Sequence, residues 1–307
     1  MPVPGFRRFS RGLANKALLE PLLRQLGFRA TRTQMIYSEV GSYGNIPVTG
    51  SAAGLQSFLE EAAQYPLFCK PVSASKSVGS VLIERLESGD LIFGNGRRFP
   101  IEEFCSEIAR DYPMGYLLQS AIRQHPDMSD VIGTAVGTVR IVTVREQTRP
   151  GVLYGLWKIP SPDAMSDNFW QDGSILAPID TGSGRTGQCR TGSGADARDV
   201  HTHPVSGRPL TGVEIPFWKD ACDAVARAHA LFPQFGVIGW DVSITEDGPL
   251  IVEANQNPFH SLYQIANLRG IGNPDFQPIF DRTTAKSAEL FPEEMKKRGL
   301  RNLFSKS

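Results

Sequence analysis

Apolar residues recur every three or four positions in some parts of the chain and alternate with polar residues, or run unbroken, in others. The helical spacing predicts amphipathic helices over residues 10–26, 51–64, 101–110, 214–231 and 259–269. Short runs rich in β-branched and aromatic residues predict strands at 67–72, 81–86, 90–94, 115–122, 138–144, 152–159, 237–245 and 249–255. Helices and strands are mixed in both halves, so we expect an α+β fold with two lobes.

Four segments follow from this pattern. Residues 1–50 form an N-terminal helical and extended segment, 51–122 a small lobe, 123–285 a large lobe and 286–307 a basic tail. Between 160 and 212 the composition changes to Gly, Ser, Thr, Asp and Pro. We interpret this stretch as a long surface excursion with room for a hairpin.

Composition and charge narrow the choice of function. The chain has 307 residues, 41% of them hydrophobic, and 32 basic against 32 acidic side chains. This balance argues against a protein that coats nucleic acid or an anionic membrane. Basic residues cluster at both ends; we interpret both clusters as solvated faces, with a phosphate-rich partner as the less favoured alternative.

The chain also lacks the patterns of export and membrane insertion. Its first residues, MPVPGFRRFSRG, contain no apolar run typical of a secretory signal, and no stretch approaches the ~18 apolar residues that span a bilayer. Its four cysteines lie far apart, without a C-x-x-C pair, and are expected to be reduced. We therefore expect a cytoplasmic protein without stable membrane insertion.

The last two strands, in GWDVSITEDGPLIVEAN, carry the sharpest local signal. Side chains alternate along a strand, so Glu253 and Asn255 share one face. A turn centred on Asp247 would set Asp241 opposite Glu253, with facing Cβ atoms about 5 Å apart. Two carboxylates and an amide without a basic neighbour suit Mg²⁺. The alternative is the solvated side of an edge hairpin.

Basic residues in three other strands suggest contacts with phosphate. Lys70 ends a strand and precedes a loop of small residues that includes Ser75, Ser77 and Gly79, although such a loop is more often only a turn. Arg140 and Lys158 lie inside apolar strands, where a charge is costly unless it faces a polar site or finds a partner. The alternative is that Arg140 and Lys158 lie at a sheet edge and expose their charged groups to solvent.

These residues, in this order, resemble the ATP-grasp superfamily, and most closely its sugar-transfer-associated branch, with D-alanine-D-alanine ligase as a more distant relative. The resemblance runs from about Lys16 to Leu268 and rests on KP with SVG after it, LLQSAI, GTVRIVTV, SDNFWQDGS and GWDVSITEDGPLIVEANQNP. It implies two α+β lobes that clasp ATP, with little or no domain before them, since fifteen residues precede Lys16.

The resemblance also assigns roles to residues. Lys70 and Lys16 contact phosphates, and the hinge contacts adenine. Asp241, Glu253 and Asn255 bind Mg²⁺. The hinge corresponds to Gln119, Ser120, Ala121 and Ile122; its first position is often Glu in relatives, which puts a tight lid over the nucleotide in doubt.

The leading functional hypothesis is an ATP-dependent ligase that converts a substrate carboxylate to an acyl phosphate for attack by an amine, in cell-surface sugar or natural-product assembly. Arg140 and Lys158 would hold charge in the transition state. The segment after them carries Asp167, Asn168 and His203, with Arg185 and Arg190 as candidates to hold the carboxylate.

Two alternatives remain beside the ligase. A kinase acting on a small-molecule or glycan hydroxyl would use Asp167 or His203 as base, and a nucleotide-binding partner protein would have lost turnover. A metal site at His201 and His203 is less favoured than a loop or substrate-site role. We expect small-molecule carboxylate and amine substrates, no nucleic acid, and room for a homodimer or a partner enzyme.

Overall fold

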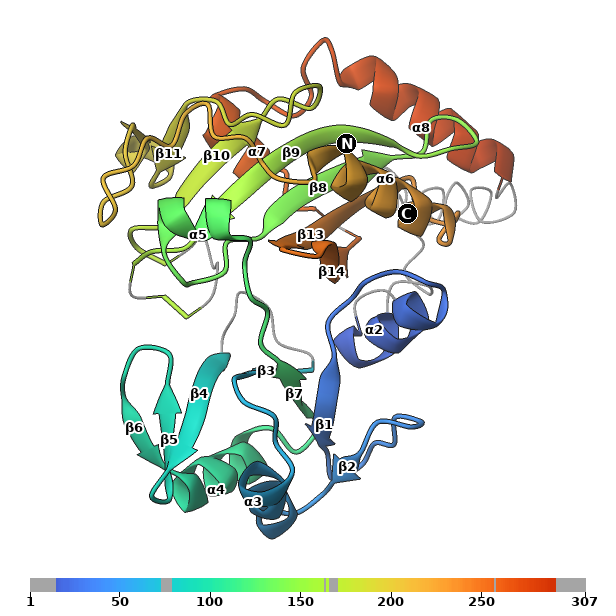
Figure 1. Cartoon of the computed structure of the whole chain (residues 1–307). Helices are drawn as coiled ribbons and strands as arrows, with labels where there is room; N and C mark the ends of the chain where they lie inside the picture. Colours follow the sequence, from blue (N-terminus) through green and yellow to red (C-terminus); the bar gives the residue numbers. More distant parts are fainter. Residues whose placement is uncertain (1–14, 73–78, 163, 166–170, 257, 291–307) are drawn as a thin grey trace, which may run out of the picture.

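The protein forms two lobes joined by a hinge and an N-terminal helix (Figure 1). The structure, a computed structural model, describes residues 15–72, 79–162, 164–165, 171–256 and 258–290. Both lobes combine a mixed or antiparallel sheet with helices, which confirms the α+β fold. Of the described helices, none is long and apolar enough to cross a bilayer.

The small lobe is a seven-stranded sheet in the order β2-β1-β7-β3-β4-β5-β6. Its strands are β1 (Thr33–Tyr37), β2 (Val48–Thr49), β3 (Leu67–Pro71), β4 (Val81–Glu87), β5 (Asp90–Phe93), β6 (Arg98–Pro100) and β7 (Tyr116–Ser120). Helices α3 (Ala52–Glu61) and α4 (Ile101–Asp111) cover one face and bury Leu55, Leu59, Phe104 and Ile108 against it. The boundary drawn in the sequence at residue 50 cuts through this sheet, because β1 and β2 belong to it.

The large lobe is a second seven-stranded sheet in the order β12-β11-β10-β9-β8-β13-β14. Its strands are β8 (Val139–Val144), β9 (Gly151–Ile159), β10 (Ile175–Ile179), β11 (Cys189–Thr191), β12 (Arg198–Val200), β13 (Val237–Thr245) and β14 (Gly248–Asn255). The remaining helices are α5 (Pro126–Ile132), α6 (Trp218–Ala230), α7 (Ser261–Asn267), α8 (Gln277–Leu290) and the short 3-10 helix η1 (Gly194–Asp196). Side chains on both faces of β8 and β13 are buried, which explains why these two strands have the most apolar sequences.

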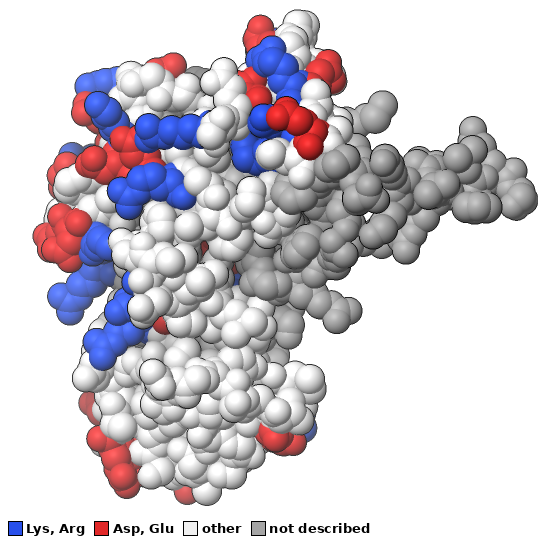
Figure 2. Space-filling model, turned by 90° about the vertical axis from the view of Figure 1, so that its right-hand side faces the viewer, with Lys and Arg blue, Asp and Glu red and all other residues white. Residues whose placement is uncertain are grey.

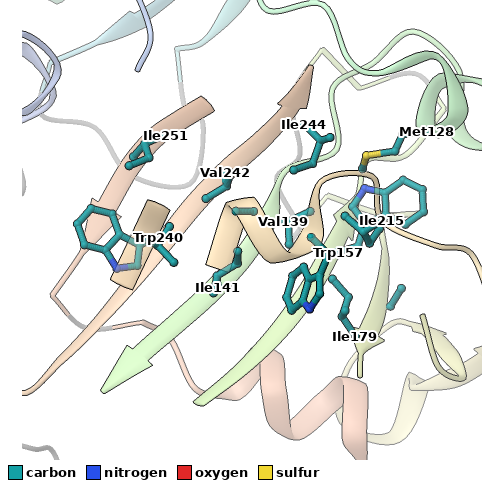
Figure 3. Close-up of a cluster of buried hydrophobic side chains, with 14 of the residues drawn as sticks. Met128, Val139, Ile141, Trp157, Ile179, Ile215, Trp240, Val242, Ile244 and Ile251 are labelled. Carbon is teal, nitrogen blue, oxygen red and sulfur yellow. The ribbon is translucent and has the colours of Figure 1, made fainter. Parts of the chain in front are cut away.

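Two hydrophobic layers sandwich this sheet. On one face Trp157, Trp240, Ile141 and Val242 pack in a common core (Figure 3), to which α6 adds Val225. On the other face α7 and α8 cover a second layer that includes Tyr154, Tyr263 and Phe280. Helices on both faces hold the three central strands rigidly, and these strands carry the charged residues described below.

The prediction of a long surface excursion between residues 160 and 212 is wrong in part. Within the described residues of this stretch, β10, β11 and β12 extend the large sheet, and Ile175, Leu176 and Ala177 are buried. The strands are too short for their alternation to stand out between glycine-rich turns, and packing in the sheet overrides the turn-rich composition.

Helix α2 (Lys16–Gln25) joins the two lobes (Figure 1). Its Leu19 and Leu23 are buried in the core of the large lobe, whereas Ala17 packs with Ile36 and Leu117 of the small lobe. The helix therefore bridges the lobes beside the hinge.

Charged groups on the outer surface are mixed in sign. In Figure 2, basic side chains of the large lobe lie among acidic ones rather than in one patch. Several form ion pairs, such as Arg282 with Glu146 at 2.8 Å and Arg29 with Asp247 at 3.2 Å. Of the N-terminal basic cluster, Arg7, Arg8 and Arg11 lie outside the described residues, as does the cluster at 296–306, whereas Lys16, Arg24, Arg29 and Arg32 are described.

Candidate active site

A pocket of about 460 Å³ lies where the lobes meet. Strands β3 and β4 form one wall with Phe68, Lys70 and Leu82. The end of β7 and the two residues after it contribute all four hinge residues, and the large lobe contributes Val252. Further apolar lining comes from Ile132, Val136, Ala164 and Met165. Its volume is in the range of small-molecule sites, and its lining is mostly apolar with a few polar groups, as such sites usually are.

Gln119 lies at the hinge end of the pocket with its side chain almost fully buried. Its amide nitrogen Nε2 donates to Glu20 Oε2 at 2.6 Å and to the hydroxyl of Thr33 at 3.0 Å. Glu20 comes from α2 and also accepts hydrogen bonds from the hydroxyls of Thr31 (3.0 Å) and Thr33 (2.6 Å). This buried carboxylate is thus held by neutral donors and ties α2 to the hinge.

Sequence analysis missed Glu20 and its two threonine partners. A glutamate in an amphipathic helix is normally taken as solvated. The available signal was its position, because Glu20 stands between Leu19 and Leu23, the two residues that the helix buries most deeply beside Ala17.

The hairpin of β13 and β14 forms with the expected Asp241–Glu253 pair, but its turn is shorter than expected. Thr245 pairs with Gly248, so the turn is one residue tighter than a turn centred on Asp247. The register then shifts between the Val242–Ile251 and Asp241–Glu253 pairs, which leaves Val252 as the extra residue of a β-bulge. The bulge restores Asp241 to its place opposite Glu253.

The expectation that these carboxylates lack a basic neighbour is wrong. Arg140 on β8 forms a bidentate ion pair with Asp241. Its Nε donates to Oδ1 at 2.5 Å and its Nη2 donates to Oδ2 at 3.0 Å. Lys158 on β9 donates to the same Oδ2 at 3.1 Å. Arg140 stands directly opposite Asp241 across neighbouring strands, a register that the sequence does not reveal.

All three of these charged side chains are buried. Burial disfavours charge on each of them, but the attraction of Arg140 and Lys158 for Asp241 outweighs it. The pKa of the Asp241 carboxyl is held below its ordinary value and the pKa of Arg140 above its own. Arg140 also donates from Nη1 to the carbonyl of Pro258 at 2.9 Å. Asp241 thus holds both basic side chains by short hydrogen bonds.

Glu253 and Asn255 lie beside this cluster. Asn255 donates from Nδ2 to Glu253 Oε1 at 3.1 Å, and Lys16 of α2 approaches Oε2 at 3.9 Å. Counting Lys16, Arg140 and Lys158 against Asp241 and Glu253 leaves one net positive charge. Neither carboxylate lines the pocket, although Val252 of the same hairpin does, so the two carboxylates lie beside it.

A search with family models decides the identity of the fold. The model described as sugar-transfer associated ATP-grasp matches residues 7–275. The chain belongs to this ATP-grasp family. No curated protein matches the sequence at a significant level.

Solved structures with a similar chain trace include several ligases. An L-amino acid ligase from Bacillus licheniformis is 14% identical with a TM-score of 0.49, and the match covers 89% of this chain and 48% of that one. The D-alanine-D-alanine ligase from Coxiella burnetii is 13% identical with a TM-score of 0.48, covering 96% and 62%. The present chain thus spans about half to three fifths of the length of these proteins.

Other residues proposed from the ATP-grasp resemblance are placed as follows. Lys70 is buried and lines the pocket. Gly79 adopts φ +74° and its carbonyl accepts a hydrogen bond from the Tyr116 hydroxyl at 2.8 Å. Ser75, Ser77, Asp167 and Asn168 lie outside the described residues.

His203 is buried and lines the ATP-grasp pocket, but it does not have the form of a base. Its Nδ1 accepts a hydrogen bond from the backbone N–H of Ser206 at 3.3 Å, so the ring proton of the neutral imidazole is on Nε2. Burial lowers the pKa of His203, which keeps the ring neutral. No described group accepts a hydrogen bond from Nε2. The Nε2–H of His203 is thus buried without a described acceptor.

The arginines expected to bind a substrate carboxylate have other partners. Arg185 pairs with Glu214 at 2.6 Å, and Arg190 pairs with Asp199 at 3.0 Å and with the carbonyl of Ala266. Neither lines the pocket, and His201 is exposed. The ligase hypothesis therefore gains nothing from these two arginines.

Proposed function

We propose that the chain is a Mg²⁺- and ATP-dependent ligase that activates a substrate carboxylate as an acyl phosphate, which an amine then attacks. The observation that carries the proposal is the buried cluster of Arg140, Lys158 and Asp241 beside the hinge pocket. Two fixed cations are suited to stabilising charge that spreads over a phosphoryl group during transfer. Neither has to move into position, because Asp241 already holds both.

The hairpin residues suit magnesium bound together with phosphate. No three His, Cys, Asp or Glu side chains in the described part of the chain gather closely enough to hold a metal by themselves. A surplus positive charge also opposes a bare cation, whereas a nucleotide triphosphate brings four negative charges and further oxygens. Asp241, Glu253 and Asn255 would hold the ion, which would supply charge neutralisation between phosphates.

A carboxylate is the phosphoryl acceptor that requires the fewest catalytic groups. It is already ionised at neutral pH, so the first step requires no base, and the net positive charge of the cluster attracts it. A hydroxyl acceptor needs a base, and Nδ1 of His203 already accepts a hydrogen bond from the Ser206 N–H, while Asp167 lies outside the described residues. Burial raises the pKa of Cys105 and Cys189 to about 12, so neither is a thiolate nucleophile.

The test is to trap the activated carboxylate. The protein is incubated with Mg²⁺-ATP, a panel of carboxylic acids and hydroxylamine, and hydroxamate, ADP and free phosphate are measured. We expect hydroxamate and phosphate in equal amounts. Glu253→Gln should form neither product. Glu214→Gln, which changes an exposed glutamate paired with Arg185, should form both. A stable phosphorylated product without free phosphate would replace the ligase by the kinase.

A further inference from the structure

The orientation of the Gln119 amide is determined by its surroundings. Glu20 Oε2 accepts from the hydroxyls of Thr31 and Thr33, so the Gln119 atom that lies 2.6 Å from this acceptor is the amide nitrogen. The hydroxyls of Thr31 and Thr33 give their protons to Glu20, and their lone pairs accept from the same nitrogen at 3.2 and 3.0 Å. A turned amide would place its oxygen against three acceptors.

The carbonyl oxygen of Gln119 is left for the pocket. No described residue donates to Oε1, and Gln119 lines the pocket beside the hinge residues. The pocket therefore meets a hydrogen-bond acceptor here, even though glutamine carries both a donor and an acceptor.

Glu20 is itself held in position from both sides. Leu19 and Leu23, its neighbours on α2, are buried in the large-lobe core, and Ala17 packs on the small lobe. The backbone N–H of Thr33 donates to Glu20 Oε1 at 2.5 Å. The helix that carries Glu20 is thus anchored in both lobes, and Thr33 binds its carboxylate.

We propose that Glu20 is a positioning residue that presents the Gln119 carbonyl to the pocket and makes the site prefer a purine with an amino group at position 6 over one with an oxygen there. An amino group donates to this carbonyl, whereas a 6-oxo group would bring two acceptors together and leave both unpaired in a buried place. The inference rests on the proposed function only in taking the pocket as the place of a nucleotide base. Its effect is expected to be a preference of about 5- to 150-fold.

The experiment compares ATP with ITP, its 6-oxo counterpart. Dissociation constants for both are measured by titration calorimetry in the presence of Mg²⁺, for the wild-type chain and Glu20→Gln. The variant keeps the shape of the side chain but adds an N–H, so Gln119 is free to turn and offer its own N–H to the pocket. We expect the ATP-to-ITP preference to be lost, so that the two dissociation constants become similar.

Thr283→Val is the matched control. It removes a buried hydroxyl in α8 that donates to the carbonyl of Ile279 and does not line the pocket, so it should lower the melting temperature without changing the preference. Equal weakening of both nucleotides in Glu20→Gln would show a merely structural role and overturn the proposal. A wild-type chain that binds ATP and ITP equally would overturn it too, and leaves the ligase proposal standing.

A variant of Gln119 keeps the test decisive if Glu20→Gln does not fold. Gln119→Leu removes the carbonyl itself, and an unchanged preference in that variant would overturn the proposal. Failure of the wild-type chain to bind either nucleotide would instead contradict the proposed function, which separates the two ideas.

Discussion

Asp241 lies between two buried cations, and its removal has consequences for both stability and catalysis. Arg140 and Lys158 each bond to it, and all three side chains are less than a tenth exposed. A loss of activity in an alanine variant at this position would therefore not by itself identify a metal ligand. Glu253, whose side chain is 27% exposed, separates the two effects.

We predict that Asp241→Ala lowers the free energy of unfolding by about 3 to 5 kcal/mol, because it leaves two buried cations without a counter-ion. Glu253→Gln should change that free energy by less than about 1 kcal/mol while abolishing ATP turnover. Urea unfolding and an ADP-release assay on both variants measure the two effects. An Asp241→Ala protein as stable as the wild type would mean that its cations find other partners.

This site shows which part of an active site a sequence reveals. Asp241, Glu253 and Asn255 lie in two strands joined by a tight turn, so their proximity follows from the period of a strand. Arg140 reaches Asp241 from a strand about a hundred residues away, and no local pattern gives the order of strands in a sheet. The expectation of an unneutralised carboxylate pair failed for this reason.

At the scale of elements, His229 connects α6 to the large sheet. The Thr143 hydroxyl lies 2.7 Å from His229 Nδ1, Trp240 donates to that hydroxyl at 2.9 Å, and the Phe235 carbonyl lies 2.9 Å from Nε2. The neutral ring satisfies all of these contacts. Burial lowers the pKa of His229 to about 4, with a smaller contribution from nearby Arg145, although the bond to Phe235 opposes the shift.

We predict that stability falls as the solution is acidified. In the unfolded chain His229 titrates near 6.5, so between about pH 6.5 and pH 4 the unfolded state binds more protons than the folded state. The contribution of His229 to the free energy of unfolding is fully present above about pH 6.5, and it is lower by about 2 kcal/mol at pH 5. Burial also lowers the pKa of His260 to about 4, which adds a second contribution of the same sign.

Urea unfolding at pH 7.5 and pH 5 isolates the share of His229. The difference between the two pH values should shrink in His229→Gln and persist in His201→Gln, whose histidine is exposed. An equal pH difference in the wild type and His229→Gln would contradict the assignment.

Sequence patterns identified most elements but not all of their pairings. The helices at 51–64 and 101–110 and the hairpin of β4 and β5 were predicted correctly, because each forms its buried face from local spacing. The strands β10 to β12 were not, since they are three to five residues long and become strands by pairing with β9 and with one another. The bulge at Val252 likewise reflects packing that no local pattern expresses.

At the scale of the molecule, α2 is the described helix that packs into the cores of both lobes, beside the hinge strand β7. Leu23 is 1% exposed within the large-lobe core, and Glu20 on the next turn binds Gln119 of the hinge. Folding of the small lobe is thus coupled to that of the large one through a helix of ten residues. A nucleotide in the pocket would contact both lobes and add to this coupling.

We predict that Leu23→Ala uncouples the lobes. The wild-type chain should melt in one calorimetric transition. Leu23→Ala, which costs about 2 to 5 kcal/mol in a packed core, should show two transitions. The small lobe should unfold first because its core is smaller. Leu22→Ala is the matched control: the same substitution on the same helix at a side chain 44% exposed should leave one transition.

Mg²⁺-ATP at 100 times its dissociation constant stabilises a binding-competent fold by about 2.7 kcal/mol, so it should merge the two transitions of Leu23→Ala again. A single transition in Leu23→Ala, shifted no further than in Leu22→Ala, would show that the lobes are held together at the hinge alone.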